Sequence, residues 1–171
     1  NGYTCDIGFQ VLLNNYDELK KLNIYKKLDM KYFNSGAEIY FKHKNLRLYN
    51  PLYHPIKTFK SNLAQIFSFR DIINIIFLIL FKKPKKTKAG FYVDLNFNNK
   101  AKKYFLLPFF RGVFLSKNLD NELSFFIKLL KKFSFGRAGI PRKGMQELPA
   151  QIIKNMKLKI QHRMCLKKID G

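Results

Sequence analysis

Gly136-Arg-Ala-Gly-Ile-Pro-Arg-Lys-Gly-Met-Gln-Glu-Leu-Pro-Ala-Gln-Ile-Ile153 places three glycines and two prolines just before an amphipathic run. Glycine adopts a positive φ, or lets a flat ligand approach the backbone, because it has no Cβ. After Gly144, apolar residues recur at helical spacing, at Met145, Leu148, Ile152 and Met156. We therefore predict a turn that opens a helix and aims backbone N–H groups at an anion or a polar ring edge. The alternative interpretation is an ordinary loop-to-helix junction.

The segment before this turn, residues 121–135, has the pattern of an amphipathic helix. Lys128, Lys131 and Lys132 fall outside the apolar face. Gly136 follows directly and is predicted to be the C′ residue of the helix. The predicted inner face consists of Phe125, Phe126, Leu129, Leu130 and Phe133.

Other elements follow from apolar periodicity and from turn residues. We predict a helix capped by Asn15, a β-hairpin with strands 37–41 and 46–49, a helix over 57–67, a helix over 95–107 that Pro108 ends, and one or two strands over 158–169.

An apolar run over residues 72–81 is followed by a lysine-rich run over 82–88. A helix needs ~20 apolar residues to span a bilayer, so ten residues predict a buried or interfacial helix instead. The lysine-rich run either lies on an anionic membrane or is a solvated loop.

The chain is strongly basic, with 33 Lys and Arg against 11 Asp and Glu, and a formal net charge of +22. This balance favours anionic partners: nucleic acid, an acidic membrane surface or a phosphate-bearing cofactor. The alternative is a compositional bias, because lysine is enriched throughout and phosphate-binding surfaces more often use arginine.

Two cysteines, Cys5 and Cys165, form neither a disulfide framework nor a metal-ligand spacing. With no secretory signal visible, we expect a reducing, cytoplasmic location, with association to a membrane surface as an option. Because residue 1 is not Met and the last residues lead into an open turn, we expect a partial chain.

The sequence lacks the residue patterns of self-sufficient catalysis. It contains no Ser/His/Asp arrangement, no paired carboxylates in a pocket pattern and no phosphate-binding glycine loop. Glu147, in the first turn of its predicted helix, is interpreted as an acid that caps the helix and complements its dipole. If the chain is enzymatic, a cofactor must supply the chemistry, and no catalytic residue is assigned.

Three segments together resemble the flavin-dependent amine oxidoreductases, and most closely their phytoene-desaturase-like and protoporphyrinogen-oxidase-like subgroup. They are Asp6-Ile-Gly8-Phe-Gln10-Val-Leu12, Pro108-Phe-Phe-Arg-Gly-Val-Phe-Leu115, and the stretch from Phe135 to Pro149. Arg111 stands where the family pattern has a small residue, and Leu107 where it has a basic one.

The resemblance implies an α+β fold: a helix-rich substrate-binding domain with a small sheet over 13–139, flanked by pieces of a Rossmann-like FAD-binding domain over 1–12 and 140–171. The cofactor would be FAD, contacted by Gly8, Phe9, Gln10, Gly144 and Met145.

The resemblance further implies an oxidoreductase that transfers hydride equivalents from a small or apolar substrate to FAD. Its Gly-x-Gly-x-x-Gly loop and C-terminal flavin segment have no counterpart in residues 1–171, so we expect this chain alone to be inactive and not to retain FAD. The alternative function is a basic module for anionic membranes or nucleic acid. Nucleic acid ranks lower, because basic and aromatic residues do not alternate on a recognisable nucleic-acid-binding fold.

Overall fold

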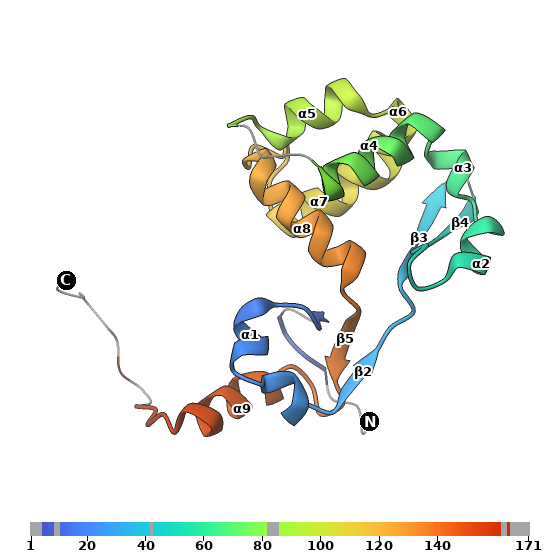
Figure 1. The fold of residues 1–171 in the computed structure, drawn as a ribbon. Coiled ribbons are helices and arrows are strands. Elements are labelled where there is room, and N and C mark those ends of the chain that lie inside the picture. The colour runs from blue at the N-terminus through green and yellow to red at the C-terminus, as the bar shows by residue number, and fades with distance from the viewer. Residues whose placement is uncertain (1–4, 9–10, 42, 82–85, 162–163, 165–171) are drawn as a thin grey trace. The chain divides into compact units, whose positions relative to one another are not determined.

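The computed structural model describes residues 5–8, 11–41, 43–81, 86–161 and 164. The chain forms two compact units: residues 1–32 with 139–171 (unit 1), and residues 33–138 (unit 2). Helices dominate and the strands form small sheets, so the predicted α+β class is confirmed (Figure 1). The unit boundaries follow Tyr32 and Ala138, whereas the predicted domain boundaries follow residues 12 and 139. The assignment of the pieces to flavin and substrate domains stays a prediction.

Unit 1 is built around a three-stranded sheet of order β1-β5-β2. Strands β2 and β5 are antiparallel, with Met30 opposite Pro141 and Tyr32 opposite Gly139. The elements of unit 1 are β1 (Leu12–Leu13), α1 (Asp17–Lys21), the 3₁₀ helix η1 (Ile24–Lys27), β2 (Met30–Tyr32), β5 (Ala138–Pro141) and α9 (Glu147–Met156).

The core of unit 1 forms where α9 meets β1 and η1. Buried Leu12, Ile24 and Leu28 contact the predicted apolar residues Met145, Leu148 and Ile152. The predicted helix face is therefore confirmed for these three. It is wrong for Met156, which is 50% exposed in the last turn of α9.

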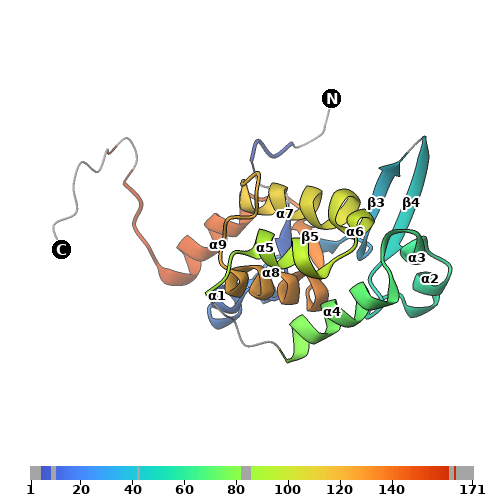
Figure 2. The same cartoon turned by 90° about the horizontal axis from the view of Figure 1, so that it is seen from above.

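Unit 2 combines a hairpin with a group of helices. The predicted hairpin is confirmed, with Gly36 opposite Tyr49 and Ala37 opposite Leu48, and α2 and α3 lie beside it (Figure 2). The elements of unit 2 are β3 (Gly36–Phe41), β4 (Lys44–Tyr49), α2 (Pro55–Phe59), α3 (Leu63–Ile66), α4 (Phe69–Leu80), α5 (Ala89–Asn96), α6 (Asn99–Ala101), the π-helical segment η2 (Lys102–Leu106), α7 (Leu107–Phe114) and α8 (Leu123–Phe135).

The predicted helix over 57–67 is wrong as a single element, because the chain turns between α2 and α3. The Ser61 hydroxyl donates to the carbonyl oxygen of Thr58 at 2.6 Å. The Asn62 side chain accepts the N–H of Arg47 in β4 at 3.0 Å. Short polar side chains that bond the backbone compete with helix continuation, and here they fix the turn against the hairpin.

Pro108 does not end a helix, contrary to the prediction. Helix α5 ends at Asn96, and α6, η2 and α7 then continue the helical path to Phe114. Pro108 is the second residue of α7, directly after η2, and it has no N–H to donate to the helical ladder. The wider turn of η2 immediately before it accommodates this change in hydrogen bonding.

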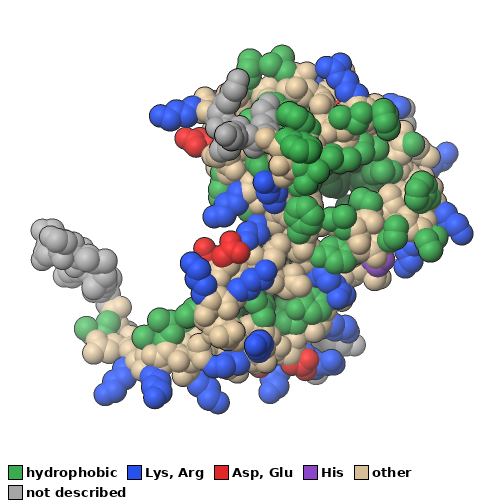
Figure 3. Space-filling model, viewed as in Figure 1, with side chains coloured by type: hydrophobic (Ala, Val, Ile, Leu, Met, Phe, Trp, Pro, Cys, Tyr) green, Lys and Arg blue, Asp and Glu red, His purple; other side chains and the backbone are tan. Residues whose placement is uncertain are grey.

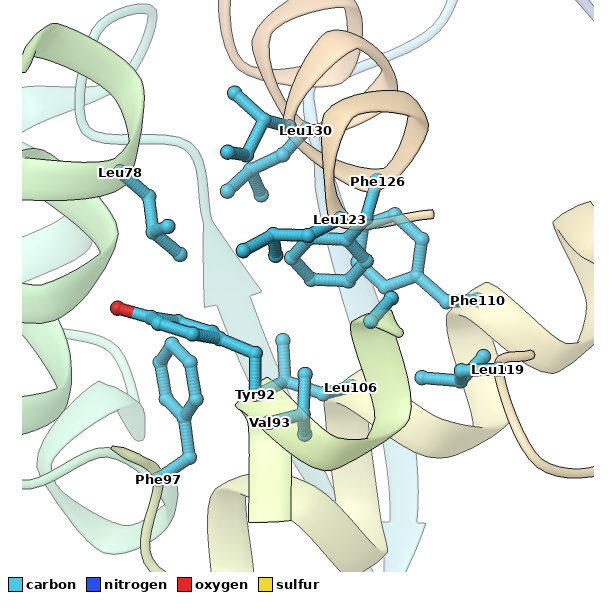
Figure 4. Packing of buried hydrophobic residues seen from close by; sticks show 12 residues of the cluster. Leu78, Tyr92, Val93, Phe97, Leu106, Phe110, Leu119, Leu123, Phe126 and Leu130 are labelled. Carbon is cyan, nitrogen blue, oxygen red and sulfur yellow. The ribbon is translucent and has the colours of Figure 1, made fainter. Parts of the chain in front are cut away.

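The core of unit 2 gathers around α8, whose helical assignment is confirmed. Phe126 and Leu130 are buried as predicted, while Phe125 is 45% exposed and does not belong to the inner face. Gly136 has φ −100°, so it caps α8 in an extended conformation and is not the left-handed C′ residue that we predicted. Figure 4 shows this core, which includes Leu78, Tyr92, Val93, Phe97, Leu106, Phe110, Leu119, Leu123, Phe126 and Leu130.

Two further predictions are wrong at the ends of unit 1. Tyr16 caps α1, and the side chain of Asn15 is not its cap. Residues 158–161 form no strand, and the rest of the predicted strand, apart from Met164, lies outside the described residues.

A buried carboxylate joins two helix N-termini in unit 2. Asp71 is 1% exposed, the lowest exposure of any charged side chain in the described ranges. Its Oδ2 accepts the N–H and the hydroxyl of Ser68, at 2.7 and 2.6 Å, and so forms the capping box of α4. Its Oδ1 accepts the N–H of Asn98, the N-cap of α6, at 2.9 Å, and the Asn98 amide also donates to Asp71.

Burial by itself raises the pKa of Asp71, because it disfavours the charged form. The hydrogen bonds from Ser68 and Asn98 favour the carboxylate and together outweigh burial, so the pKa lies below its ordinary value. Asp71 therefore stays ionised in the folded protein at neutral pH.

Replacing Asp71 with asparagine should destabilise the chain by about 2–4 kcal/mol at pH 7. The NH₂ group of asparagine would face N–H and O–H donors whose hydrogen bonds the carboxylate now accepts. Since the pKa is lowered in the folded state, the stabilisation is present above about pH 4 and is lost as pH falls through the folded pKa. Urea unfolding should be measured from pH 7 to pH 3. The difference in the free energy of unfolding between wild type and D71N should become smaller only at the acid end of this range.

The control is D120N, because the side chain of Asp120 is 57% exposed and pairs with Lys88 at 3.7 Å. Its effect should stay within about 0.5 kcal/mol. Equal effects of D71N and D120N, or a gap that persists unchanged to pH 3, would contradict the role of Asp71.

Two glycines of unit 2 should respond oppositely to alanine. Gly112 lies within α7, and a Cβ there would meet no atom within 4 Å, so G112A should stabilise the chain by about 1 kcal/mol through helix propensity. A Cβ at Gly90 would lie 2.3 Å from the carbonyl oxygen of Asn118, so G90A should destabilise it by about 1–3 kcal/mol. The midpoint temperatures of thermal unfolding of both variants test this prediction. A lower midpoint for G112A than for wild type would contradict it.

Candidate functional site

The glycine-rich turn returns the chain from β5 to α9. The N–H of Gly144 donates to the carbonyl oxygen of Pro141 at 2.9 Å, and the N–H of Glu147 donates to the carbonyl oxygen of Gly144 at 3.2 Å. Gly144 has φ 90°, a backbone conformation that residues other than glycine rarely adopt. The predicted special turn is therefore confirmed, although α9 begins at Glu147 and not directly after Gly144.

A second contact fixes the start of this turn to β2. The N–H of Arg142 donates to the carbonyl oxygen of Asp29 at 2.8 Å, and Arg142 Nε contacts Asp29 Oδ2 at 2.7 Å. The two side chains are mostly exposed, so the ion pair contributes little to stability. The backbone bond continues the pairing of β2 and β5 to the edge of the turn.

Asp6 connects the N-terminal segment to the same turn. Its carboxylate accepts the N–H of Met145 through Oδ1 at 3.0 Å and Oδ2 at 3.1 Å, across 139 residues of sequence. The negative charge lies at the N-terminal end of α9, where the helix dipole favours it. This charge-assisted bond holds residues 5–8 beside the turn.

The turn does aim the N–H of Met145 at an anion, but that anion is the carboxylate of Asp6, so this donor is not free for a ligand. Sequence reasoning assigned no role to Asp6. The available signal was a single acid in an otherwise apolar segment, together with a turn whose N–H groups need acceptors.

The predicted cofactor-contacting residues have different environments. Gly8 is exposed, and a Cβ there would meet no atom within 4 Å, so a flat ring can approach its backbone. Gly144 is buried, and Met145 is half-buried against the unit 1 core. Phe9 and Gln10 lie outside the described residues. The structure therefore brings the segment of Gly8 together with Gly144 and Met145, and their contact with a cofactor stays a prediction.

Glu147 lies in the first turn of α9, as predicted, where an acid complements the helix dipole, but its side chain does not cap the helix. The N-cap of α9 is Gln146, with no side-chain cap bond. The Oε2 atom of Glu147 is buried and has no hydrogen-bond partner. A buried acceptor without a donor is unusual in a folded protein, and here it lies two residues after Met145, whose N–H is bound by Asp6.

Tyr25 supports the strand that follows the Gly8 segment. Its hydroxyl donates to the carbonyl oxygen of Leu13 at 2.5 Å and accepts the N–H of Tyr16 at 3.2 Å. Burial raises the pKa of Tyr25 to about 12, so the hydroxyl remains a donor at neutral pH.

Metal chemistry gains no support from the described ranges, in which no cluster of three or more His, Cys, Asp or Glu side chains could hold an ion.

Comparison with known proteins gives one match. The model of the family described as flavin-containing amine oxidoreductase matches residues 1–171. The search of curated proteins and the search of solved structures give no match.

Removing the Asp6 carboxylate should loosen the turn. In D6A, the amide proton of Met145 should exchange with solvent at least tenfold faster, because a charge-assisted hydrogen bond contributes about 1.5–3 kcal/mol. Amide exchange by NMR measures this directly. The control is E18A, which removes another acid of unit 1 and should leave Met145 unchanged. Equal protection of Met145 in D6A and wild type would contradict the bond.

Proposed function

We propose that this chain, which belongs to the flavin-containing amine oxidoreductase family, forms one wall of the flavin site with unit 1 and the substrate-binding domain with unit 2. The family implies a flavin-dependent oxidoreductase with FAD as cofactor. When bound, FAD accepts hydride equivalents from the substrate. We place the chain in the phytoene-desaturase-like and protoporphyrinogen-oxidase-like subgroup, with a small or apolar substrate.

The observation that carries this proposal is the bond between Asp6 and Met145. The first and third family-like segments are far apart in sequence, and each was assigned to the flavin site separately. A direct hydrogen bond between them supports a single site formed by both. The two segments meet at Asp6 and Met145, two residues before the exposed Gly8 and one residue after the positive-φ Gly144.

Each residue has a specific proposed task. The bare backbone at Gly8 lies along the face of the isoalloxazine ring, because no side chain stands in the way. Glu147 Oε2 accepts a hydrogen bond from a ring N–H and thereby gains the partner that it lacks. Gly144 and Met145 fix the edge of the site through the turn and through Asp6.

An apolar substrate is supported by half-buried aromatic rings in unit 2. Phe105 and Phe109 are stacked with centroids 5.8 Å apart, and Phe133 meets Phe109 edge-on at 4.8 Å. All three rings keep part of their surface exposed. Such a row offers apolar contact area to an isoprenoid-like molecule.

The test is an NMR titration of the isotopically labelled 171-residue chain with FMN, FAD and ADP in turn. At high ligand concentration the amides of Gly8, Gly144 and Met145 should shift with FMN and FAD, because both carry the isoalloxazine ring. Such weak binding agrees with the expectation that the chain alone does not retain FAD. They should not shift with ADP, because the proposed contacts are to the ring. The amide of Gly112, in unit 2, is the internal reference.

Two variants test the named contacts. E147A should weaken FMN binding about tenfold, since it removes a hydrogen bond to a charged acceptor, whereas E18A should leave it unchanged. Shifts at these three amides with ADP, or none with FMN, would refute the proposed ring site.

A further inference from the structure

Helix α4 carries an exposed apolar stripe. Its residues recur at helical spacing, so they lie on one face of the helix. Figure 3 shows hydrophobic side chains gathered over α4 in unit 2. The stripe, which we call the α4 stripe, consists of Phe69, Ile73, Ile76, Phe77 and Leu80, with exposures from 48% to 79%.

The opposite face of α4 is already occupied by the core of unit 2. Leu78 is fully buried there, and Ile72 and Ile75 are packed against the buried clusters. The core therefore accounts for one apolar face and leaves the α4 stripe uncovered by the described residues. A surface helix is normally polar on its outer side, so the stripe requires a partner.

Cations predominate among the charged residues beside the stripe. Arg70 lies exposed on α4, and exposed Lys86 and Lys88 lie just beyond its C-terminal end. Lys88 contacts the exposed carboxylate of Asp120 at 3.7 Å, so it is partly neutralised. The sequence adds Lys82, Lys83 and Lys85 between them. The acid of this helix, Asp71, is buried and bonded to Ser68 and Asn98, so it does not neutralise these cations.

Helix α4 is long enough to lie on a membrane surface but too short to span a bilayer. Its 12 residues make a helix about 18 Å long, shorter than the ~30 Å hydrocarbon core. Within the described ranges, no helix reaches the length and apolarity needed to cross a bilayer.

We propose that α4 binds in the plane of an anionic lipid surface, with the α4 stripe among the acyl chains and the neighbouring Lys and Arg side chains at the anionic headgroups. A second copy of this chain fits less well, because two such faces would bring cationic residues of both copies together. This interaction is independent of the flavin site.

The first test is vesicle flotation of the full chain at 150 mM NaCl, with phosphatidylcholine vesicles and with vesicles containing 30% phosphatidylglycerol. The wild-type chain should float with the anionic vesicles and far less with the neutral ones. F77S/L80S should lower the partition coefficient at least tenfold. The matched control L158S/I160S removes two apolar side chains that are each 49% exposed and should leave it unchanged.

A second test avoids any loss of apolar area. The chain contains no tryptophan, so F77W introduces a single fluorescent reporter into the α4 stripe. Its emission should shift to the blue with anionic vesicles, while that of L158W should not. Circular dichroism verifies that all variants are folded.

Several results would overturn the proposal. They are equal flotation of F77S/L80S and wild type, equal binding to neutral and anionic vesicles, and an unchanged F77W spectrum. Gel filtration showing a wild-type dimer that F77S/L80S abolishes, without vesicle binding, would identify a second copy as the partner.

Discussion

Asp71 holds unit 2 together because one buried carboxylate satisfies the N-termini of both α4 and α6. Burying an ionised carboxylate costs several kcal/mol unless donors surround it, and here Ser68 and Asn98 provide them. The two buried clusters of unit 2 meet at this junction, since Ile75 and Phe105 pack against both. The orientation of α4, and hence of the α4 stripe, depends on this polar contact within an apolar core.

Unit 1 also has a carboxylate that accepts backbone hydrogen bonds at a helix start, and it lies at the site that we propose for flavin. Asp6 accepts a donor at the start of α9 and fixes two segments that are distant in the sequence. In both units, therefore, an acid is used to order a helix start. The chain has 33 Lys and Arg against 11 Asp and Glu, and this excess of cations suits an anionic surface as partner.

The two proposals concern different parts of the chain and different physical effects. The flavin proposal depends on open backbone at Gly8, a turn at Gly144 and the buried Oε2 of Glu147. The lipid proposal depends on an apolar helix face and neighbouring cations in unit 2. Because each compact unit has its own core, each function can be altered without the other.

The sequence by itself determined the hairpin, the helices α4 and α8 and the turn at Gly144, because local periodicity and glycine chemistry act over a few residues. Three separate motifs carried the family resemblance, and that resemblance implied the α+β class. It could not place Pro108, whose effect depends on the π turn before it, nor Asn62, whose side chain bonds a neighbouring strand. Only the tertiary structure decided that Phe125 faces outward, that Asp71 is buried and that Asp6 reaches Met145. Those outcomes depend on contacts between residues distant in the sequence, which no local pattern encodes.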